Sequence, residues 1–353
     1  MGIKNLKFII SKYAMNGVQE KSLISYAKKK IAIDTSIYMY RFIYKNSDPI
    51  EPLVKQIVRL LKNGIIPFYV FDGKPPKEKN EVLDERMERK KELWNKCDEM
   101  KMILNGEINE DKICDEYKGL STEELQEKLE KTKRSIIHVS WKNICDAKEL
   151  FTLMGIPFIE ADGEAETLCA WLSKKDLVSG CLSEDTDILA NGGKHFLRNF
   201  NINSNKIIEY SLDDILMELE MTYEQFIDMC ILCGCDYTCT ITNIGVERAY
   251  KYIKKYGNIE NIIEFINNEN QALIAKGKPN RYTVPDKFDY IISRQLLKHS
   301  GDNYNIDDFK DIIKINMETF DKNALLEFLK DRIKFGTLRD IEKNIEKYHK
   351  NVL

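Results

Sequence analysis

The chain has 353 residues, of which 43% are hydrophobic and 31% charged, and its formal net charge is −3. This composition supports a large folded core and excludes a globally basic nucleic-acid-binding protein, so any basic surface must be local. No apolar run approaches the ~20 residues of a membrane span, and the basic start MGIKNLKFIISKY lacks the pattern of a signal peptide. We therefore expect an intracellular protein.

Short β-rich runs alternate with helical patterns in the first part of the chain. Helical patterns lie at 51–63 and 143–155, among others. The runs are KKKIAID to Asp34, IIPFYVFD to Asp72, IPFIEAD to Asp162 and LVSGCLSED to Asp185. This alternation predicts an α/β fold with a mostly parallel central sheet and helices on both faces. KHFLRNF and KIIEYS are candidates for additional edge strands.

A highly charged insertion at about 74–140 interrupts the alternation. It reads as a helical arch with two legs around the middle ILNGEINED, and the second leg opens with the capping-box pair Ser121 and Glu124. After Leu212 the chain reads as helices to its end. We predict an α/β core at 1–225 that carries the arch, and a helical C-terminal region at 226–353 with a hairpin at about 240–260.

Each of the four β-rich runs ends in an acid, and in a parallel sheet these ends open into the crevice where ligands bind. Asp34, Asp72 and Asp185 are therefore expected to converge. Asp187 joins them if the backbone stays extended, since residues two apart on a strand point the same way. Taken singly, Asp34 or Asp162 could merely cap the helix that follows.

Three further acids extend this set. Glu164 and Glu166 diverge by roughly 200° on a regular helix, so both reach the site only if Glu164 lies at the cap or first turn. Asp236 follows an apolar helix in GCDY, whereas Glu184 is expected to face away. Hard oxygen ligands without histidine suit magnesium or manganese and not zinc. Two ions ~3.5–4 Å apart fit in-line displacement at phosphorus.

The first leg of the arch separates its charges around the helix. At ~100° per residue, its basic side chains gather on one side and four glutamates on the other. The basic members are Lys79, Arg86, Arg89 and Lys90. A stripe of this kind next to acids and metal suits a phosphate backbone. The alternative is a solvated face, which pairs such as Glu85–Arg89 at i,i+4 support.

The segment 240–262 reads as a turn followed by a helix with a basic outer face. Its turn NIG contains Asn243 and Gly245, residue types that tolerate left-handed backbone. Such a hairpin aims backbone N–H groups at a phosphate. The four cysteines at 230–239 could suggest a metal–thiolate site, but they read better as small residues of a buried helix.

These motifs together resemble the flap endonuclease family, the XPG-type structure-specific 5′ nucleases. The resemblance covers roughly residues 1–270 and rests on MGIKNL, IAIDTS, VFDGKPP, EADGEAET, SEDTDILA and GCDYTCTITNIGVERA, in order. It implies two Mg²⁺ ions, for which Mn²⁺ can substitute. Their ligands would be Asp34, Asp72, Glu164, Glu166, Asp185, Asp187 and Asp236.

The resemblance also implies roles for other residues. Lys79 and Arg86, together with Asp34 and Asp185, would carry the catalytic work at the scissile phosphate. Tyr40 would stack on a neighbouring base, and Gly2 would lie near the site once Met1 is removed. The hairpin would bind duplex DNA. In the family, backbone carbonyls of this hairpin also hold a K⁺ ion. Further DNA contacts would come from Arg89, Lys90, Asn243, Gly245, Arg248 and Lys251.

The chain departs from the family pattern in three places. The segment 44–52 is shorter than the family loop that helps form the pocket for a 3′ flap. Glu247 near the hairpin is unfavourable beside a phosphate, which would weaken duplex anchoring. No sliding-clamp motif is evident near the C-terminus, so we do not expect clamp binding.

Together, these features predict a monomeric, magnesium-dependent 5′ nuclease that cuts branched or flapped DNA in replication or repair. It would act in the nucleus or at another site of DNA synthesis. Within the family, a 5′-3′ exonuclease on duplex DNA stays open, and a junction resolvase is less favoured because the arch is complete. An inactive DNA-binding scaffold and a haloacid-dehalogenase-like phosphatase are weaker alternatives. The phosphatase needs a second Asp two residues after its nucleophile, where this chain has Ser36.

Overall fold

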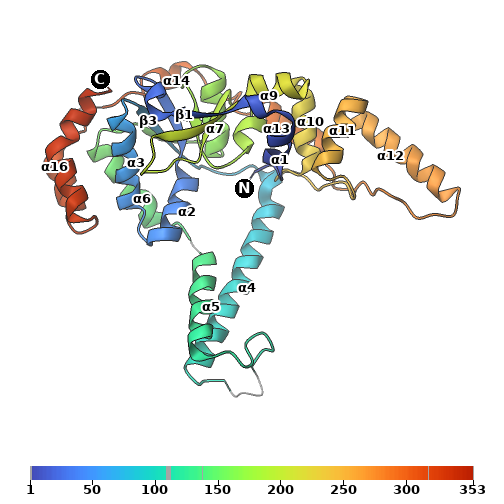
Figure 1. Ribbon diagram of the computed structural model, residues 1–353, viewed down its shortest axis with the longest axis horizontal. Coiled ribbons are helices and arrows are strands. Elements are labelled where there is room, and N and C mark those ends of the chain that lie inside the picture. The colour runs from blue at the N-terminus through green and yellow to red at the C-terminus, as the bar shows by residue number, and fades with distance from the viewer. Residues whose placement is uncertain (1, 109–112, 137, 317, 353) are drawn as a thin grey trace.

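The computed structural model describes residues 2–108, 113–136, 138–316 and 318–352. A seven-stranded sheet forms its centre, in the order β1-β7-β6-β5-β2-β3-β4 (Figure 1). The strands are β1 (Val18–Ser22), β2 (Lys30–Asp34), β3 (Ile66–Phe71), β4 (Phe158–Glu160), β5 (Cys181–Leu182), β6 (His195–Arg198) and β7 (Lys206–Ser211).

Strands β2 to β6 run parallel, whereas β7 is antiparallel to both β6 and β1. The predicted mostly parallel sheet is therefore confirmed. The two additional strands also exist, but they are not edges, because β1 pairs with β7 and covers it. Strand β1 was not predicted, because its residues VQEKS are polar and largely exposed.

Side chains alternate across the sheet and feed two separate cores. In β3, Phe68 and Val70 join one hydrophobic cluster, whereas Tyr69 and Phe71 join the other. This period of two is what a strand buried on both faces requires. Helices must therefore cover both faces of the sheet, as the sequence predicted.

Two sets of helices supply that cover. The first core receives α1 (Leu6–Tyr13), α7 (Ala165–Lys174), α8 (Asp187–Ala190), α9 (Leu212–Leu219), α10 (Tyr223–Cys233), α11 (Val246–Tyr256), α12 (Ile259–Ile274), α13 (Tyr290–Lys298) and α14 (Asp307–Lys310). The second receives α2 (Thr35–Asn46), α3 (Ile50–Lys62), α6 (Trp141–Leu153), α15 (Lys322–Leu329) and α16 (Phe335–Lys350). Short 3₁₀ turns lie at Met15–Gly17, Leu23–Tyr26 and Lys77–Lys79. The end of the chain thus returns to the α/β core.

The charged insertion projects from the core as an arch of two helices (Figure 1). Its legs are α4 (Asn80–Leu104) and α5 (Thr122–Ser135), and the predicted capping box at Ser121 is present. The legs share a small core of their own, formed by Cys97, Met100, Tyr117, Leu125, Leu129 and Ile136. Part of the predicted middle of the arch, residues 109–111, lies outside the described residues.

After β7, the described part of the chain contains helices and no further strand. The second half of helix α10, from Met229, is apolar, and Cys230 and Cys233 are buried in it as small core residues. Helix α12 and the segment that returns from it project from the body of the molecule on the side opposite α16 (Figure 1). Among the described residues, no helix is both long enough and apolar enough to cross a membrane.

Candidate active site

The carboxyl ends of neighbouring strands bring four acids together. Asp34 is the last residue of β2 and caps α2, accepting a hydrogen bond from the Ile37 N–H at 3.2 Å. Asp72 directly follows β3 and accepts from the Ala165 N–H at 2.8 Å. Asp34 therefore both caps α2 and lies in the acid cluster, so the two roles that the sequence suggested for it are compatible.

Asp185 and Asp187 reach the site by a turn and not by a continued strand. Strand β5 already ends at Leu182, and Asp187 is the first residue of α8. The Asp187 N–H donates to Asp185 Oδ1 at 3.0 Å, while the Ile3 N–H donates to Asp187 Oδ1 at 2.8 Å. Asp187 therefore lies beside the other acids, as expected. The prediction that an extended backbone would bring it there is wrong, because the chain turns into α8.

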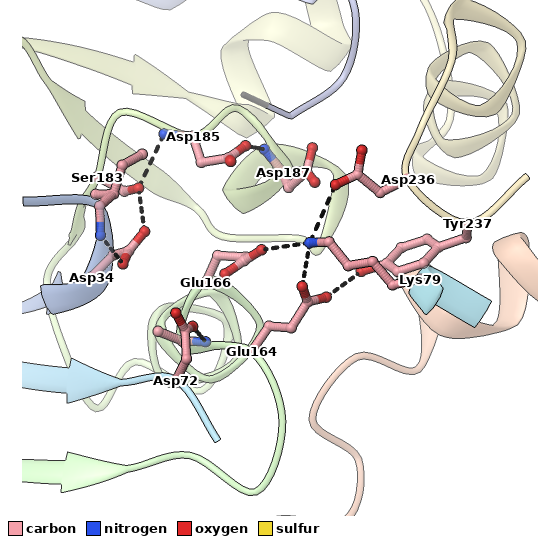
Figure 2. A network of polar contacts seen from close by, with 12 residues as sticks. Asp34, Asp72, Lys79, Glu164, Glu166, Ser183, Asp185, Asp187, Asp236 and Tyr237 are labelled. Atoms are coloured by element: carbon pink, nitrogen blue, oxygen red, sulfur yellow. Dashed lines mark hydrogen bonds and ion pairs between the residues drawn. The ribbon is translucent and has the colours of Figure 1, made fainter. Parts of the chain in front are cut away.

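Helix α7 contributes two glutamates at its start. Glu164 occupies the N-cap position and Glu166 the first turn, which is the arrangement that lets both point into one site (Figure 2). Glu164 accepts a hydrogen bond from the Tyr237 hydroxyl at 2.8 Å. Asp236 comes from the loop after α10, so acids from five separate parts of the chain meet here.

Two cations of the arch base lie among these acids. Lys79 forms an ion pair with Glu164, and its Nζ lies 3.2 Å from Asp236 and 3.9 Å from Glu166 (Figure 2). Lys79 is 8% exposed. The guanidinium of Arg86 donates to Asp236 at 2.8 Å. The predicted basic stripe therefore splits: its first two members reach the acids.

Burial and mutual repulsion shift the protonation of this cluster. Burial, reinforced by Asp72, raises the pKa of Asp34 to about 7. Burial and repulsion from Glu164 raise the pKa of Glu166 well above its ordinary value, and burial with Asp185 does the same to Asp187. Burial alone would lower the pKa of Lys79, but the surrounding carboxylates raise it, so the ammonium stays charged.

The donor set fits hard divalent cations. Oxygen atoms of Glu166, Asp185 and Asp187 all lie within 4.8 Å of one another, and no histidine or cysteine shares that group. Carboxylates held this close repel unless a cation compensates them. All of the seven acids except Asp187 line a cavity of about 230 Å³ together with Tyr40, Lys79 and Arg86. The cavity therefore combines metal ligands, two fixed cations and an aromatic wall.

The other basic residues of the stripe lie farther from the acids. Arg89 is exposed and 3.5 Å from Glu85, while Lys90 Nζ lies 5.9 Å from the centre of the Tyr40 ring. With Tyr40 and Arg86 they line a groove of about 910 Å³ under the arch, between α2, α4 and α5. The groove opens from the cavity of the acids, since both share Tyr40 and Arg86.

The predicted hairpin residues form a separate surface. Asn243 adopts the left-handed backbone (φ 63°), whereas Gly245 has φ −90° and is the N-cap of α11, so only one residue of the turn uses the expected freedom. Arg248 donates to the backbone carbonyl of Asn243. Lys251 is exposed on α11. None of these four residues contacts the acids.

Gly2 lies against the acids, as expected. Its φ is +86°, and a Cβ at this position would lie 2.0 Å from Asp185 Oδ1 and 2.8 Å from Asp187 Oδ1. Any side chain here would collide with the two carboxylates. Glycine is therefore required by the close approach of the N-terminal segment.

About half of the sequence matches known family patterns. Residues 1–93 match the XPG N-terminal domain and residues 155–236 match the XPG I-region. Flap endonuclease 1 of Glycine max is 34% identical, over 98% of this chain and 86% of that protein. Flap endonuclease 1 of Entamoeba histolytica is 33% identical, over 100% of this chain and 88% of that protein. The chain belongs to the flap endonuclease family.

A solved structure agrees in fold with this family member. The catalytic core of Rad2 in complex with DNA substrate matches with a TM-score of 0.71 over 98% of this chain and 99% of that chain, at 23% identity. At that identity the likeness concerns the fold alone. It includes both the sheet and the helical C-terminal region, because nearly the whole chain is aligned.

Two side chains that hold the acids in place in this flap endonuclease family member were not predicted from the sequence. Ser183 Oγ donates to Asp34 at 2.8 Å and accepts from the Asp185 N–H at 3.0 Å, so it links the end of β2 to the turn after β5. Tyr237 orients Glu164. Their only signal was position, since each stands within two residues of a predicted ligand. Glu184 faces away, as expected, and pairs with Arg41 and Arg198.

Proposed function

We propose that this chain is a metal-dependent, structure-specific 5′ nuclease that cuts branched DNA at 5′ flaps during replication or repair and leaves a 5′ phosphate. One observation carries the proposal: six carboxylates from five parts of the fold line one cavity with Lys79 and Arg86 at the base of an arch, and Asp187 lies beside two of them. A site built only for stability would not concentrate buried like charges in this way.

Two Mg²⁺ ions, or Mn²⁺ in their place, are the cofactors that this donor set suits. Their ligands are the seven carboxylates Asp34, Asp72, Glu164, Glu166, Asp185, Asp187 and Asp236. When bound, such ions supply Lewis acidity and a nucleophile for in-line hydrolysis at phosphorus. Ser183 and Tyr237 hold individual carboxylates in place, so the site is organised by the protein itself.

The arch base handles the negative charge of the substrate. Lys79 and Arg86 are fixed by the same acids that would hold the metal, so they can neutralise charge on the reacting phosphate without reorganising. Tyr40 is 40% exposed on the wall of the cavity and offers its ring to a nucleobase beside that phosphate. Arg89 and Lys90 extend this path along the groove under the arch.

The hairpin is the proposed duplex-binding element, through Asn243, Gly245, Arg248 and Lys251. Glu247, which the sequence analysis expected to weaken anchoring, is paired with Lys12 of α1 and lies 4.0 Å from Lys251. Its charge is therefore partly compensated. A K⁺ ion bound by backbone carbonyls at this turn would compete with the Arg248 guanidinium for the carbonyl of Asn243.

The remaining parts of the proposal concern partners and place. We propose a monomer that acts at sites of DNA replication, in the nucleus where the cell has one, without a clamp-binding motif of the usual kind. The short connection between α2 and α3, residues 47–49, leaves little chain for a 3′-flap pocket. We therefore expect a double flap with a one-nucleotide 3′ flap to be cut no faster than a plain 5′ flap.

A panel of 5′-labelled DNAs with Mg²⁺ tests this function. A 5′ flap should be incised once near its base, whereas single-stranded DNA should be left intact. A ladder of short products from blunt duplex would instead favour a 5′-3′ exonuclease. No cleavage of any member, by protein that still retards the flap on a gel, would contradict the proposal and favour a binding scaffold.

A further inference from the structure

The helix α12 and the segment that returns from it form an arm beside the hairpin (Figure 1). The arm comprises α12 (Ile259–Ile274) and residues 275–285, and its outer turn is 275–278. At ~1.5 Å per residue, the sixteen residues of α12 span about 24 Å. None of the residues of this arm lines the cavity of the acids.

The returning segment is fastened to the hairpin by its backbone. Asn243 Nδ2 donates to the Arg281 carbonyl at 2.7 Å, and the Thr242 N–H donates to the Thr283 carbonyl at 3.0 Å. These bonds involve the same turn that was assigned to the duplex. The arm and the hairpin therefore present one continuous surface.

The returning segment is equally fastened to α12. Asn270 Nδ2 donates to the Tyr282 carbonyl at 2.8 Å and its Oδ1 accepts from the Arg281 N–H at 3.2 Å. Tyr282 is 1% exposed, and its hydroxyl lies 2.6 Å from that of Tyr252 on α11. Hydrogen bonds therefore hold the backbone of this segment in place before any ligand binds.

Three cations project from this fixed backbone. Lys276, Lys278 and Arg281 are all exposed, and none of them forms an ion pair with any of the described residues. The carboxylates of α12 lie elsewhere. Glu260 pairs with Arg294, whereas Glu264 and Glu269 line a separate hollow with Lys255, which none of the three cations lines. The surface beside the hairpin therefore carries uncompensated positive charge.

We propose that this arm is a second duplex-binding element, in which Lys276, Lys278 and Arg281 contact phosphates of the DNA beyond those held by the hairpin. The inference rests on the proposed function, since it extends the duplex that the hairpin binds. Lys276 follows Asn270 by six residues, which at ~1.5 Å each corresponds to about 9 Å. At ~3.4 Å per step of one strand, the arm adds about three base pairs to the footprint.

The test measures affinity for flapped DNA against salt and against duplex length. The full chain and the variant Lys276→Gln/Lys278→Gln/Arg281→Gln are compared by KM and kcat. Loss of three phosphate contacts should lower the slope of log affinity against log salt by about 2 to 3. The kcat at saturating DNA should stay unchanged, because none of the three residues touches the cavity of the acids. When the duplex is shortened one base pair at a time, the wild type should begin to lose affinity at a duplex about three base pairs longer than the length at which the variant does.

Two matched variants keep the result specific. Lys343→Gln/Lys347→Gln/Lys350→Gln removes the same charge from α16, at the other end of the molecule, and should leave the slope unchanged (Figure 1). The conservative variant Lys276→Arg/Lys278→Arg/Arg281→Lys should keep the wild-type slope.

An arm variant with the wild-type slope and length profile would overturn the inference. So would an equal loss of affinity for flap DNA in both glutamine variants, since net charge alone would then explain it. Neither result touches the proposed function as long as the wild type cuts flaps. Failure of the wild type to cut or bind flaps would defeat both.

Discussion

The acid cavity and the arch both concentrate charge, but they neutralise it in different ways. Along the arch, charges pair with neighbours one helical turn away, as in Lys101–Asp98 at 2.8 Å and Lys133–Glu130 at 2.7 Å. In the cavity, Lys79 pairs with Glu164, Glu166 and Asp236, and Arg86 pairs with Asp236 as well, so two cations face the whole acid cluster. Solvent screens the first set, whereas burial raises the pKa of several members of the second.

This difference separates charge that keeps a helix soluble from charge that serves chemistry. Exposed pairs at i,i+3 and i,i+4 contribute little to stability and can be exchanged. Buried like charges destabilise the protein unless a bound cation compensates them, so we infer that they are retained for that cation. The comparison predicts opposite responses to substitution in the two regions.

The largest effect is expected from Asp34→Asn. The amide keeps the shape of the side chain but removes a ligand charge, so flap cleavage should fall by about 10³-fold or more. Without metal, the same variant should melt at a higher temperature than the wild type, because one repelling charge is gone. Single-turnover rates and thermal melts in chelator check both. An Asp34→Asn variant that cuts flaps at the wild-type rate would contradict the proposed difference between the acid cavity and the arch.

Lys79→Met should lower the rate of cleavage by about 10²-fold through loss of a fixed cation at the phosphate. It should also destabilise the metal-free protein, since Lys79 compensates three carboxylates. The control is Lys77→Met, two residues away and exposed, which should change neither quantity. Equal effects of both variants would mean that Lys79 acts only through net charge.

The stability of the metal-free protein should fall as the pH rises. The pKa of Asp34 is about 7 in the folded chain against 3.8 ordinarily, so the folded state holds the extra proton between these values. Its stabilising effect is complete below about pH 4 and is lost as the pH rises through 7. The melting temperature of Asp34→Asn minus that of the wild type should therefore grow by a few degrees from about pH 5 to pH 8.

Added Mg²⁺ should reverse that trend by compensating the deprotonated acids. It should raise the melting temperature of the wild type more at pH 8 than at pH 5. A difference between Asp34→Asn and wild type that is constant with pH would contradict the assigned protonation.

The smallest effect is expected in the arch. Glu127→Gln breaks an exposed pair with Lys131, and both partners are well solvated. The melting temperature should change by less than about 1 °C. Flap cleavage should be unchanged, because Glu127 lines neither the cavity nor the groove. A large loss of activity would show that arch charges act on the DNA beyond the basic stripe.

The sequence predicted the acids well because their positions follow from topology. In a parallel sheet, residues at the ends of neighbouring strands lie close together, and Asp34 at the end of β2 and Asp72 directly after β3 do so. Asp185 joins them from the turn that follows β5. Glu164 was predicted conditionally, and its N-cap position meets the condition. Asp187 reached the site by a local turn, which no period-two pattern could reveal.

The parts that the sequence did not predict depend on partners far along the chain. The polar strand β1 exists because β7 pairs with it, nearly two hundred residues later. Ser183 and Tyr237 carry hydroxyls whose acceptors are set by tertiary structure. The small core of the arch, with Leu125 and Leu129, has too few apolar residues to stand out in a charged sequence.

The central claim is that the acid cavity cuts DNA with metal, and one measurement tests it most directly. A labelled double-flap DNA is incubated with Mg²⁺ and either the wild type or Asp185→Ala, with retardation of the same DNA measured in parallel. We predict a single incision near the base of the 5′ flap by the wild type, and binding without incision by the variant. Equal incision by both proteins, or none by a wild type that still binds, would contradict the account.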